Sequence, residues 1–222
     1  MNAHRSLSFL RQLISNNNRE WFQANKELYL ACKADFEQFT TDYINAMLSV
    51  EPQLAGLKPA DCMWRIYRDT RFSLDKTPYK NHFGTFLAQK GGKKSQYGGY
   101  YFHLQPDACM FAAGMWCPEK DLLLSLRQSV YDNYDELEDL MQAPSFRRYF
   151  TDFDSYYSLK TVPHGYPRDF EHADWLKLKT FTITCPLSEE DVCRPDFLDL
   201  LVDISKAAKP LNDFLNYTLE EF

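Results

Sequence analysis

The residues most able to do chemistry lie between Arg65 and His82, in the run R-I-Y-R-D-T-R-F-S-L-D-K-T-P-Y-K-N-H. Extended to Lys94, this stretch holds eight Lys or Arg residues and two Asp residues, a net charge of +6 in a protein whose formal net charge is −6. Arginine binds phosphate and carboxylate through a planar fork, and lysine supplies a mobile point charge. The run therefore favours a partner that carries negative charge.

Two main interpretations of this basic run stay open, beside a third in which its charges are solvated and take part in neither. In the first, the cations bind a ligand anion, and Tyr79 and His82 add hydrogen bonds or exchange protons. In the second, Asp69 and Asp75 pair with the arginines, and the run is an internal ion-pair network that holds a strand and the Thr77-Pro78 turn. The candidate ligand-binding residues of the first interpretation are Arg65, Arg68, Arg71, Lys76, Tyr79, Lys80 and His82, joined by Lys177 and Lys179 if strand register brings them to the site.

No motif in the chain identifies a reaction. The G-G-K-K-S turn at 91–95 lacks the spacing of a phosphate-binding loop and precedes a predicted strand instead of a helix. The histidines are isolated and the cysteines lack zinc-type spacing, so we expect no metal site. Hydrolase and dinucleotide-binding motifs are also missing from the sequence. The sequence thus assigns neither a catalytic residue, nor a cofactor, nor an oligomeric state.

Composition limits the classes of partner. A pI near 5.4 argues against a general nucleic-acid binder, which is normally basic across its domain. A non-catalytic module for nucleic acid or an acidic protein stays open as the alternative function, with the Lys90–Lys94 turn and the arginine strand as its basic surface and Tyr97, Tyr100 and Tyr101 as stacking rings. We read neither a signal peptide nor a membrane span. Six cysteines without C-x-x-C spacing favour reduced thiols and the cytoplasm.

Periodicity predicts one α+β domain over residues 1–222, with a mainly antiparallel sheet packed by helices from both ends of the chain. Strands are predicted at 63–69, 83–89, 97–104, 109–116 and 175–184, where short aromatic-rich segments are bounded by turn residues. Helices are predicted at 7–14, from Arg19 to Pro52 after an Asn18 cap, from Pro118 to 130 and at 134–141. A capping box at Ser188 and Asp191 should begin two C-terminal helices that separate near Pro210.

Besides the Arg65–His82 run, the chain contains six further motifs: N-N-R-E-W-F (17–22), G-Y-Y-F-H (99–103), V-P-H-G-Y-P (162–167), L-K-L-K-T-F (176–181), P-L-S-E-E (186–190) and P-L-N-D-F-L (210–215). Together these motifs resemble a family of bacterial and fungal proteins known as a conserved domain of unknown function. The resemblance extends from about Phe9 to Leu219, and the Arg65–His82 run is its most specific part. His164 departs from the pattern, since the family often carries lysine there. The resemblance implies an intact cytoplasmic domain and brings no substrate, cofactor or catalytic residue.

Overall fold

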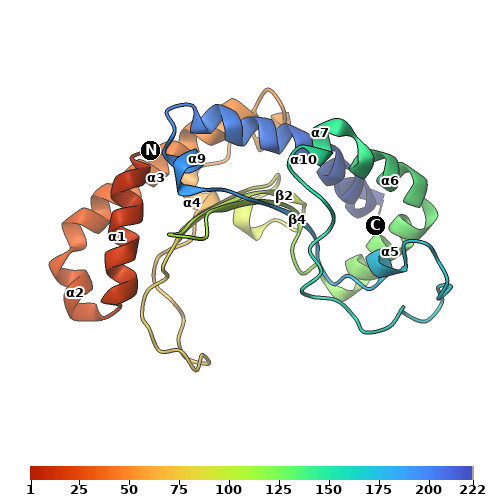
Figure 1. Cartoon of the computed structure of the whole chain (residues 1–222), viewed down its shortest axis with the longest axis horizontal. Helices are drawn as coiled ribbons and strands as arrows, with labels where there is room; N and C mark the ends of the chain where they lie inside the picture. Colours follow the sequence, from red (N-terminus) through yellow and green to blue (C-terminus); the bar gives the residue numbers. More distant parts are fainter. Residues whose placement is uncertain (222) are drawn as a thin grey trace. The chain divides into compact units, whose positions relative to one another are not determined.

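The computed structural model of the chain describes residues 1–221 and has an α+β fold, with helices at both ends of the chain and a four-stranded antiparallel sheet (Figure 1). The strands follow one another in the sheet in the order β1 (Phe83–Leu87), β2 (Gly99–Leu104), β3 (Met110–Met115) and β4 (Phe181–Pro186). This arrangement confirms the predicted fold class, and β1, β2 and β3 lie within the segments predicted to form them.

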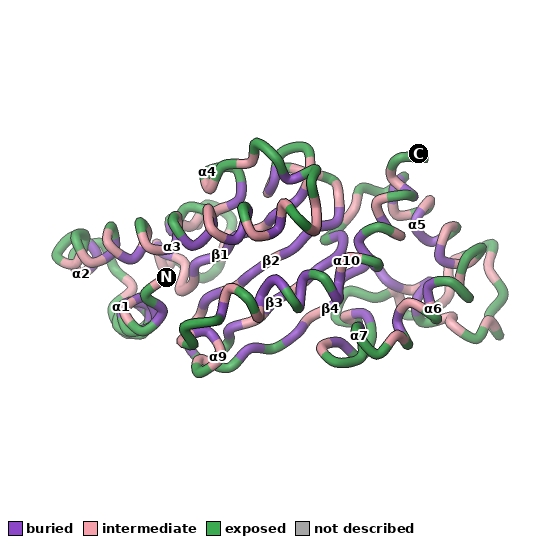
Figure 2. Tube along the Cα trace, turned by 90° about the horizontal axis from the view of Figure 1, so that it is seen from above, coloured by how far each residue is buried: buried purple, intermediate pink, exposed green. Residues whose placement is uncertain are grey.

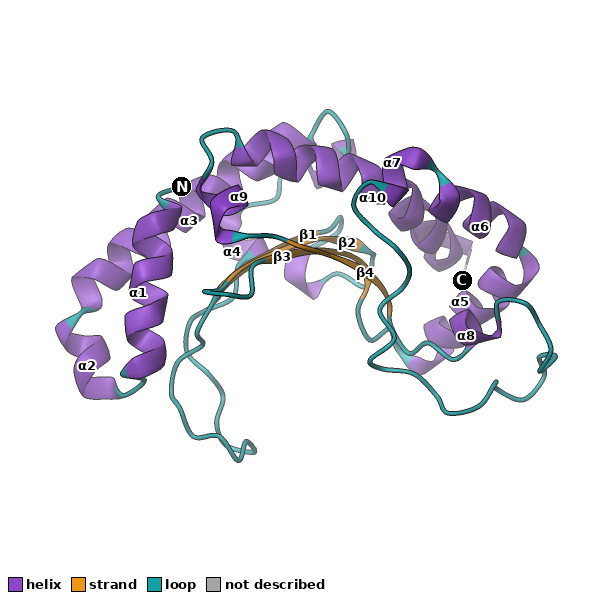
Figure 3. Cartoon of the chain, viewed as in Figure 1, coloured by secondary structure: helices purple, strands orange, loops and turns teal. Residues whose placement is uncertain are grey.

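Helices make up most of the remaining regular structure (Figure 3). The α-helices are α1 (Ala3–Ser15), α2 (Arg19–Ala24), α3 (Lys26–Met47), α4 (Pro59–Cys62), α5 (Lys120–Asp132), α6 (Tyr134–Gln142), α7 (Pro144–Arg147), α8 (Ala173–Leu176), α9 (Glu189–Cys193) and α10 (Phe197–Glu221), and the 3-10 turns are η1 (Pro52–Leu54) and η2 (Gly92–Lys94). The predicted caps are confirmed: Asn18 accepts from the Trp21 N–H at 2.9 Å, and Ser188 and Asp191 form a capping box at the start of α9.

Two compact units share the chain. The first unit contains Met1–Lys94, Tyr101–Phe111 and Pro186–Val202. The second contains Ser95–Tyr100, Ala112–Cys185 and the described residues from Asp203 onward. The division falls within β2 and β3, so both units take residues from these strands. A single domain over residues 1–222 stays a prediction.

The core of the first unit is a stack of phenylalanine rings between α3 and one face of the sheet. Phe36 lies 5.4 Å from Phe83 and 6.1 Å from Phe102, measured between ring centroids. Phe39 stacks on Phe197 of α10 at 5.7 Å. The three rings of Phe36, Phe39 and Phe102 are at most 4% exposed, and Figure 2 shows buried chain along the strands. Burial of this apolar area is the main force that holds α3 on the sheet.

The other face of the same strands is polar. Successive side chains of a strand point to opposite faces, so the burial of Tyr100, Phe102 and Leu104 in β2 leaves Tyr101 and His103 on the opposite side, where both are half-buried. This face of the first unit carries the candidate site.

Within the second unit, asparagines of α10 bind the chain before and within β2. The Gly98 N–H donates to Asn216 Oδ1 at 2.7 Å, and Asn212 Nδ2 donates to the Gly99 carbonyl at 3.1 Å. A Cβ atom on Gly98 would lie 3.0 Å from Asn212 Oδ1, so this approach requires glycine. These contacts give the P-L-N-D-F-L motif a structural role.

Two helix boundaries predicted from the sequence are wrong. The long helix expected after Arg19 is interrupted at Asn25, which ends α2 and begins α3, and its side chain donates to the Trp21 carbonyl at 2.9 Å. At the other end of the chain, Pro210 lies inside α10 and does not separate two helices. Proline removes one N–H donor there, but Ala208 and Leu211 are fully buried on either side, so packing keeps the helix continuous.

Two strand predictions and one helix start also need correction. Residues 63–69 form only isolated bridges, Met63 with Thr85 and Tyr67 with Tyr79. Only Met63 pairs with β1, because the residues after it pair with the segment 78–80 that precedes β1. The segment 175–184 begins inside α8, and its strand starts only at Phe181. Trp175 and Leu176 are both buried, which a strand with one buried face does not allow. Pro118 lies before α5, whose N-cap is Glu119.

Candidate functional site

The basic run forms a protruding arm in which the chain runs out and returns, and we define it as residues 66–80 (Figure 1). Its two sides are joined by hydrogen bonds from the Arg68 N–H to the Pro78 carbonyl at 2.9 Å and from the Lys80 N–H to the Ile66 carbonyl at 2.7 Å. At the tip, Phe72 and Leu74 are 96% and 103% exposed, so they contact almost nothing in the described chain. The arm thus has a tip free in solvent and a base attached to the sheet.

The base of the arm is anchored to the N-terminal helices through Tyr79. The side-chain amide of Asn17 pairs with the Tyr79 backbone, donating to its carbonyl at 2.9 Å and accepting from its N–H at 3.1 Å. The Tyr79 ring stacks on Phe22 with centroids 3.9 Å apart and is 6% exposed. The backbone and ring of Tyr79 therefore position the base of the arm, and its expected role in binding a ligand stays a prediction.

Toward the tip of the arm, the cations from Arg68 to Lys76 have partners. Arg68 hydrogen-bonds Asp75 and Thr77, and Arg71 forms a fork on Asp69, with Nη2 to Oδ2 at 2.6 Å and Nε to Oδ1 at 3.0 Å. The Thr77 N–H, Arg68 and the Thr77 hydroxyl lower the pKa of Asp75 to about 2. This part of the run matches the internal ion-pair interpretation.

One further cation of the arm, Lys76, also has a local partner. Its Nζ donates to the Thr70 carbonyl at 2.9 Å. Arg71 lowers the pKa of Asp69, first through its side chain and then through its backbone N–H. The three cations from Arg68 to Lys76 therefore all have partners within the arm.

At the base of the arm, strand pairing gathers a second set of polar groups, which we call the histidine cluster and define as His82, Tyr101, His103 and Gln105. The His82 and His103 rings lie 4.3 Å apart between centroids. Tyr101 Oη lies 2.7 Å from His103 Nδ1, and His103 Nε2 lies 3.1 Å from Gln105 Oε1. Because Gln105 Oε1 is an acceptor, His103 Nε2 carries the ring proton, and His103 Nδ1 accepts a hydrogen bond from the Tyr101 hydroxyl.

Burial keeps the histidine cluster uncharged at neutral pH. Burial, the neighbouring His103 and then Lys80 lower the pKa of His82 to about 3. Burial also lowers the pKa of His103, although its bond to Gln105 opposes this, and burial raises the pKa of Tyr101 to about 12. Such grouped shifts occur at functional sites more often than elsewhere.

Two cations accompany the histidine cluster without a counter-ion. Within residues 1–221, neither the Arg65 guanidinium nor the Lys80 ammonium makes a side-chain hydrogen bond or an ion pair. Burial lowers the pKa of Lys80, and the charge of Arg65 lowers it further, which places the two groups near each other. The charge of Arg65 also reaches Asp69, but the Asp69 oxygens are already bound by Arg71. The base of the arm is therefore where positive charge lacks a partner.

Trp64 and Gly84 complete the surroundings of Tyr101. The Trp64 ring meets the Tyr101 ring edge-on at 5.7 Å. A Cβ atom on Gly84 would lie 2.8 Å from Tyr101 Oη, so glycine at this position lets the tyrosine lie flat across β1. The cluster is thus bounded by an aromatic side chain on one side and by bare backbone on another.

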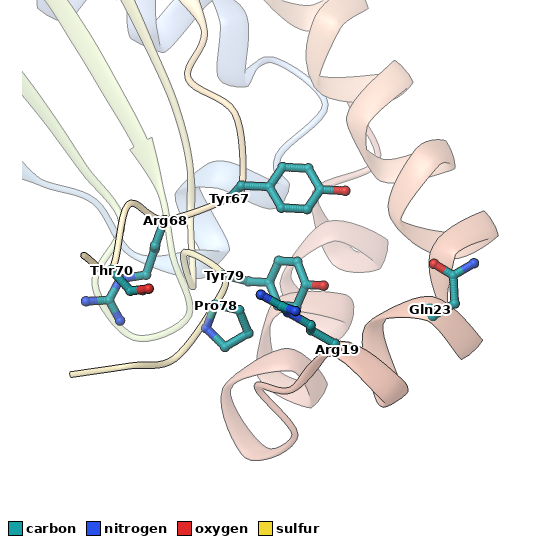
Figure 4. Close-up of a pocket in the computed structure, with 7 residues that line it drawn as sticks. All are labelled: Arg19, Gln23, Tyr67, Arg68, Thr70, Pro78 and Tyr79. Carbon is teal, nitrogen blue, oxygen red and sulfur yellow. The ribbon is translucent and has the colours of Figure 1, made fainter. Parts of the chain in front are cut away.

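A separate pocket of about 540 Å³ lies between the arm and α2 (Figure 4). Tyr67 and Tyr79 extend from the arm toward α2, which contributes Arg19 and Gln23. The Arg19 charge opposes the rise in the pKa of Tyr79 that burial causes, which places Arg19 close to the Tyr79 hydroxyl. The remaining lining residues are Arg68, Thr70 and Pro78. The pocket therefore uses both sides of the arm base and a helix that sequence reasoning did not connect with it.

Lys177 and Lys179 belong to the second unit. Lys177 Nζ pairs with Asp174 at 2.6 Å, in the turn after α8, and Lys179 is exposed. The expected shared strand face is wrong, because β4 begins only at Phe181.

The sequence analysis missed His103, Gln105, Gly84 and Asn17 as site residues. A signal for His103 was present in G-Y-Y-F-H, since strand alternation puts it on the same face as Tyr101. Its approach to His82 depends on the pairing of β1 with β2, which no local pattern encodes.

The rings proposed to stack on nucleic-acid bases differ in their accessibility. Tyr100 is only 1% exposed and therefore cannot receive a base. Tyr101 is half-buried and bonded to His103. Lys93 of the predicted basic turn donates to the carbonyls of Ala60 and Met63, the latter at 2.7 Å.

Residues 1–221 lack both a metal-binding cluster and a membrane-spanning helix. Those residues include no group of three or more His, Cys, Asp or Glu side chains placed to hold a metal ion. They also include no helix with the length and apolar character needed to cross a bilayer.

Comparison with known proteins identifies the family. A family model described as conserved hypothetical protein (DUF2461) matches residues 5–214, nearly the whole chain. No curated protein and no solved structure matched the chain. The match includes the arm, the strands that bear the histidine cluster and most of α10. The chain therefore belongs to the conserved hypothetical protein family DUF2461.

Proposed function

We propose that this protein binds a small molecule through a phosphate or carboxylate group at the histidine cluster, with Arg65 and Lys80 as the groups that hold the anion. One observation carries the proposal: these two cations lie together at the base of the arm without a carboxylate partner in the described chain. Lys80 is half-buried, and a half-buried ammonium without a counter-ion costs solvation free energy. A bound anion would recover that free energy.

The polar groups beside the two cations suit such a ligand. Arg65 can offer a planar fork to two oxygens, and Lys80 adds a point charge. Trp64, 39% exposed, offers an apolar surface for the body of the ligand. This combination of a few polar groups and an aromatic surface is typical of small-molecule sites.

His82 is the group of the cluster that can exchange a proton with the ligand. Its Nδ1 lies 3.2 Å from Asn81 Oδ1, so Nδ1 donates there and Nε2 keeps a lone pair. A bound anion would raise the pKa of His82 from about 3, because it favours the charged imidazolium. Binding should therefore take up protons and strengthen as the pH falls. An enzymatic role would use this proton transfer.

The test is a calorimetric titration of the full chain with inorganic phosphate and, separately, with acetate. Arg65→Met and Lys80→Met keep the apolar stem and remove the charge. Each should weaken binding about 10-fold or more, because a charge-assisted hydrogen bond contributes roughly 1.5–3 kcal/mol. Arg71→Met is the matched control, since Arg71 is bound to Asp69 in the arm, and it should change the affinity by less than about 2-fold.

Two results with the Arg65, Lys80 and Arg71 variants would refute the proposal, and a third with Arg19→Met would relocate the site. One is binding that survives removal of both Arg65 and Lys80 charges. The other is an equal loss of binding in Arg71→Met, which would show a general charge effect. If Arg19→Met alone abolishes binding, the ligand occupies the pocket of Figure 4, and the histidine cluster is not the anion site.

Binding of nucleic acid remains the alternative proposal, with less support. Of its three stacking rings, Tyr100 is buried, and Tyr101 is engaged by His103. Filter binding of single-stranded oligonucleotides at two ionic strengths tests it, because phosphate contacts must weaken steeply with salt. We also propose a cytoplasmic location, where the six free cysteines would stay reduced.

A further inference from the structure

Another cation without a counter-ion lies in the second unit, on α5. The helix buries Leu122, Leu126 and Val130 at intervals of four residues, and Arg127 lies beside this stripe. Arg127 is 6% exposed and is the only charged residue among the buried side chains of residues 1–221. Fully buried arginine is rare unless it is paired.

The hydrogen bonds of Arg127 leave most of its guanidinium unused. Nη2 donates to the Leu178 carbonyl at 2.8 Å, and Nε is buried without a partner. No carboxylate of the described chain forms an ion pair with it. A guanidinium has five N–H donors and stays charged in proteins, so one neutral carbonyl satisfies neither its donors nor its charge. A bound anion would stabilise a buried cation of this kind.

Aromatic residues of the loop at 162–170 lie next to this cation. Tyr166 meets Tyr131 edge-on at 5.4 Å, and its hydroxyl donates to Gln128 Oε1 at 3.3 Å. Tyr131 follows Arg127 by four residues and so lies on the same face of α5. Tyr166 and Arg127 are close enough for each to influence the pKa of the other. Phe170 adds a third ring, 5.1 Å from Tyr131.

We propose that Arg127 is the anion-binding group of a second ligand site beneath the loop at 162–170, which takes a small molecule through a carboxylate or phosphate group. The free Nε and the guanidinium fork supply charge-assisted hydrogen bonds to the anion. Tyr131, Tyr166 and Phe170 supply the apolar contacts to the rest of the molecule. The loop is fixed mainly by these rings, with Gly165 at a φ of +101° in its turn.

This site does not depend on the function proposed for the histidine cluster. All its residues belong to the second unit, whereas Arg65, Lys80 and His82 belong to the first. Loss of one site therefore leaves the other intact, and the variants of each serve as controls for the other.

The direct test observes the Arg127 Nε–H group by NMR in the full-length, ¹⁵N-labelled protein. The signal is assigned from its disappearance in Arg127→Lys. Millimolar inorganic phosphate or acetate, added separately at constant ionic strength with chloride, should move this signal to saturation. It should move equally in the Arg65→Met/Lys80→Met double variant. A response to phosphate alone or acetate alone identifies the group that is recognised, and a signal that neither anion moves overturns the proposal.

Thermal unfolding separates a ligand site from a purely structural arginine. In anion-poor buffer, Arg127→Met should be as stable as the wild type or more stable, because it removes an unpaired buried charge. Phosphate or acetate should raise the unfolding midpoint of the wild type but not that of Arg127→Met. Arg127→Lys keeps the charge without the fork and should weaken binding about 10-fold. The proposal fails if neither anion stabilises the wild type and Arg127→Met either does not fold or is destabilised equally in every buffer. Arg127 would then have only a structural role, through its hydrogen bond to the Leu178 carbonyl.

Discussion

The arm and the histidine cluster use the same basic run of the sequence and treat positive charge in opposite ways. In the arm, Arg68 and Arg71 each bind an aspartate of the arm itself. At the base, Lys80 lies near His82 and Arg65 lies near Lys80, and neither cation has a carboxylate partner among the described residues. The net charge of a segment therefore does not locate a binding site. We propose that the unmatched part of that charge does.

The physical setting of the two regions explains why this matters. Each ion pair of the arm includes an exposed aspartate, where water screens the charge and an ion pair contributes about 0–1 kcal/mol. At the base, Arg65 is exposed, but Lys80 and His82 are half-buried, and desolvation has already lowered the pKa values of both. A missing partner has a larger effect there. Four experiments can break or sharpen this contrast.

Acid should destabilise the protein mainly through His82. Its pKa is about 3 in the folded chain and about 6.5 when unfolded. Above pH 6.5 the residue is neutral in both states, and below it only the unfolded chain binds the proton, so stability falls until the pH reaches the folded pKa. At pH 4.5 the loss relative to pH 7 should be roughly 2–3 kcal/mol.

Urea unfolding at pH 7 and pH 4.5 measures this loss. His82→Gln should be less sensitive to the change in pH than the wild type by the same amount, roughly 2–3 kcal/mol. His164→Gln removes an exposed histidine and should leave the sensitivity unchanged. Equal acid losses in His82→Gln and the wild type would contradict the neutral, desolvated histidine cluster.

The next effect concerns the close approach of Gly84 to Tyr101. Gly84→Ala puts a methyl group 2.8 Å from Tyr101 Oη and 3.1 Å from Cε2, and should cost about 1–3 kcal/mol. In a Tyr101→Phe background the nearest atom is missing, so the same substitution should cost less. A double-mutant cycle from chemical denaturation gives this difference. Strict additivity would show that Gly84 and Tyr101 do not touch.

A smaller effect is expected when the hydrogen bond between Tyr101 and His103 is removed. Tyr101→Phe should destabilise the protein by about 1 kcal/mol, because His103 Nδ1 loses its donor. Long-range ¹H–¹⁵N spectra should show a changed Nδ1 shift for His103. Tyr217→Phe, at an exposed tyrosine of α10, is the matched control and should cost less than about 0.5 kcal/mol. An unchanged His103 spectrum would argue against the bond.

The smallest effect is expected in the arm. Asp75→Asn removes the charge that Arg68 binds, yet global stability should change by less than about 0.5 kcal/mol, since the Asp75 side chain is 58% exposed. Hydrogen exchange at the Thr77 N–H, which donates to Asp75 Oδ1 at 2.9 Å, should become faster. A global loss above about 1 kcal/mol would mean that the arm is part of the cooperative core, and the contrast with its base would fail.

Local patterns predicted the elements well where one signal dominates. The Asn18 cap and the Ser188–Asp191 capping box lie where a polar side chain precedes an apolar helix, and the structure confirms both. Prediction failed where packing overrides a local signal. Pro210 is accommodated because buried residues surround it in α10, and the segment around Trp175 forms a helical turn because its aromatic side chain stacks on His172 at 4.1 Å.

The candidate site was predicted in part. The sequence pointed to Arg65, Lys80 and His82, and also to Arg68, Arg71 and Lys76, which the arm satisfies internally. It did not point to His103, whose ring meets His82 across neighbouring strands. Nor did it single out Arg127, because an arginine beside an apolar stripe has the same local signature whether it is buried or exposed.

By itself, the sequence determined where helices and strands form and where positive charge concentrates, because periodicity, capping and composition act over a few neighbouring residues. Only the tertiary structure decided which cations keep a partner and which histidines lose water, because both depend on groups brought together from distant segments. Coulomb and solvation energies depend on the distances between charged groups and on their burial, and both are set only when the chain folds.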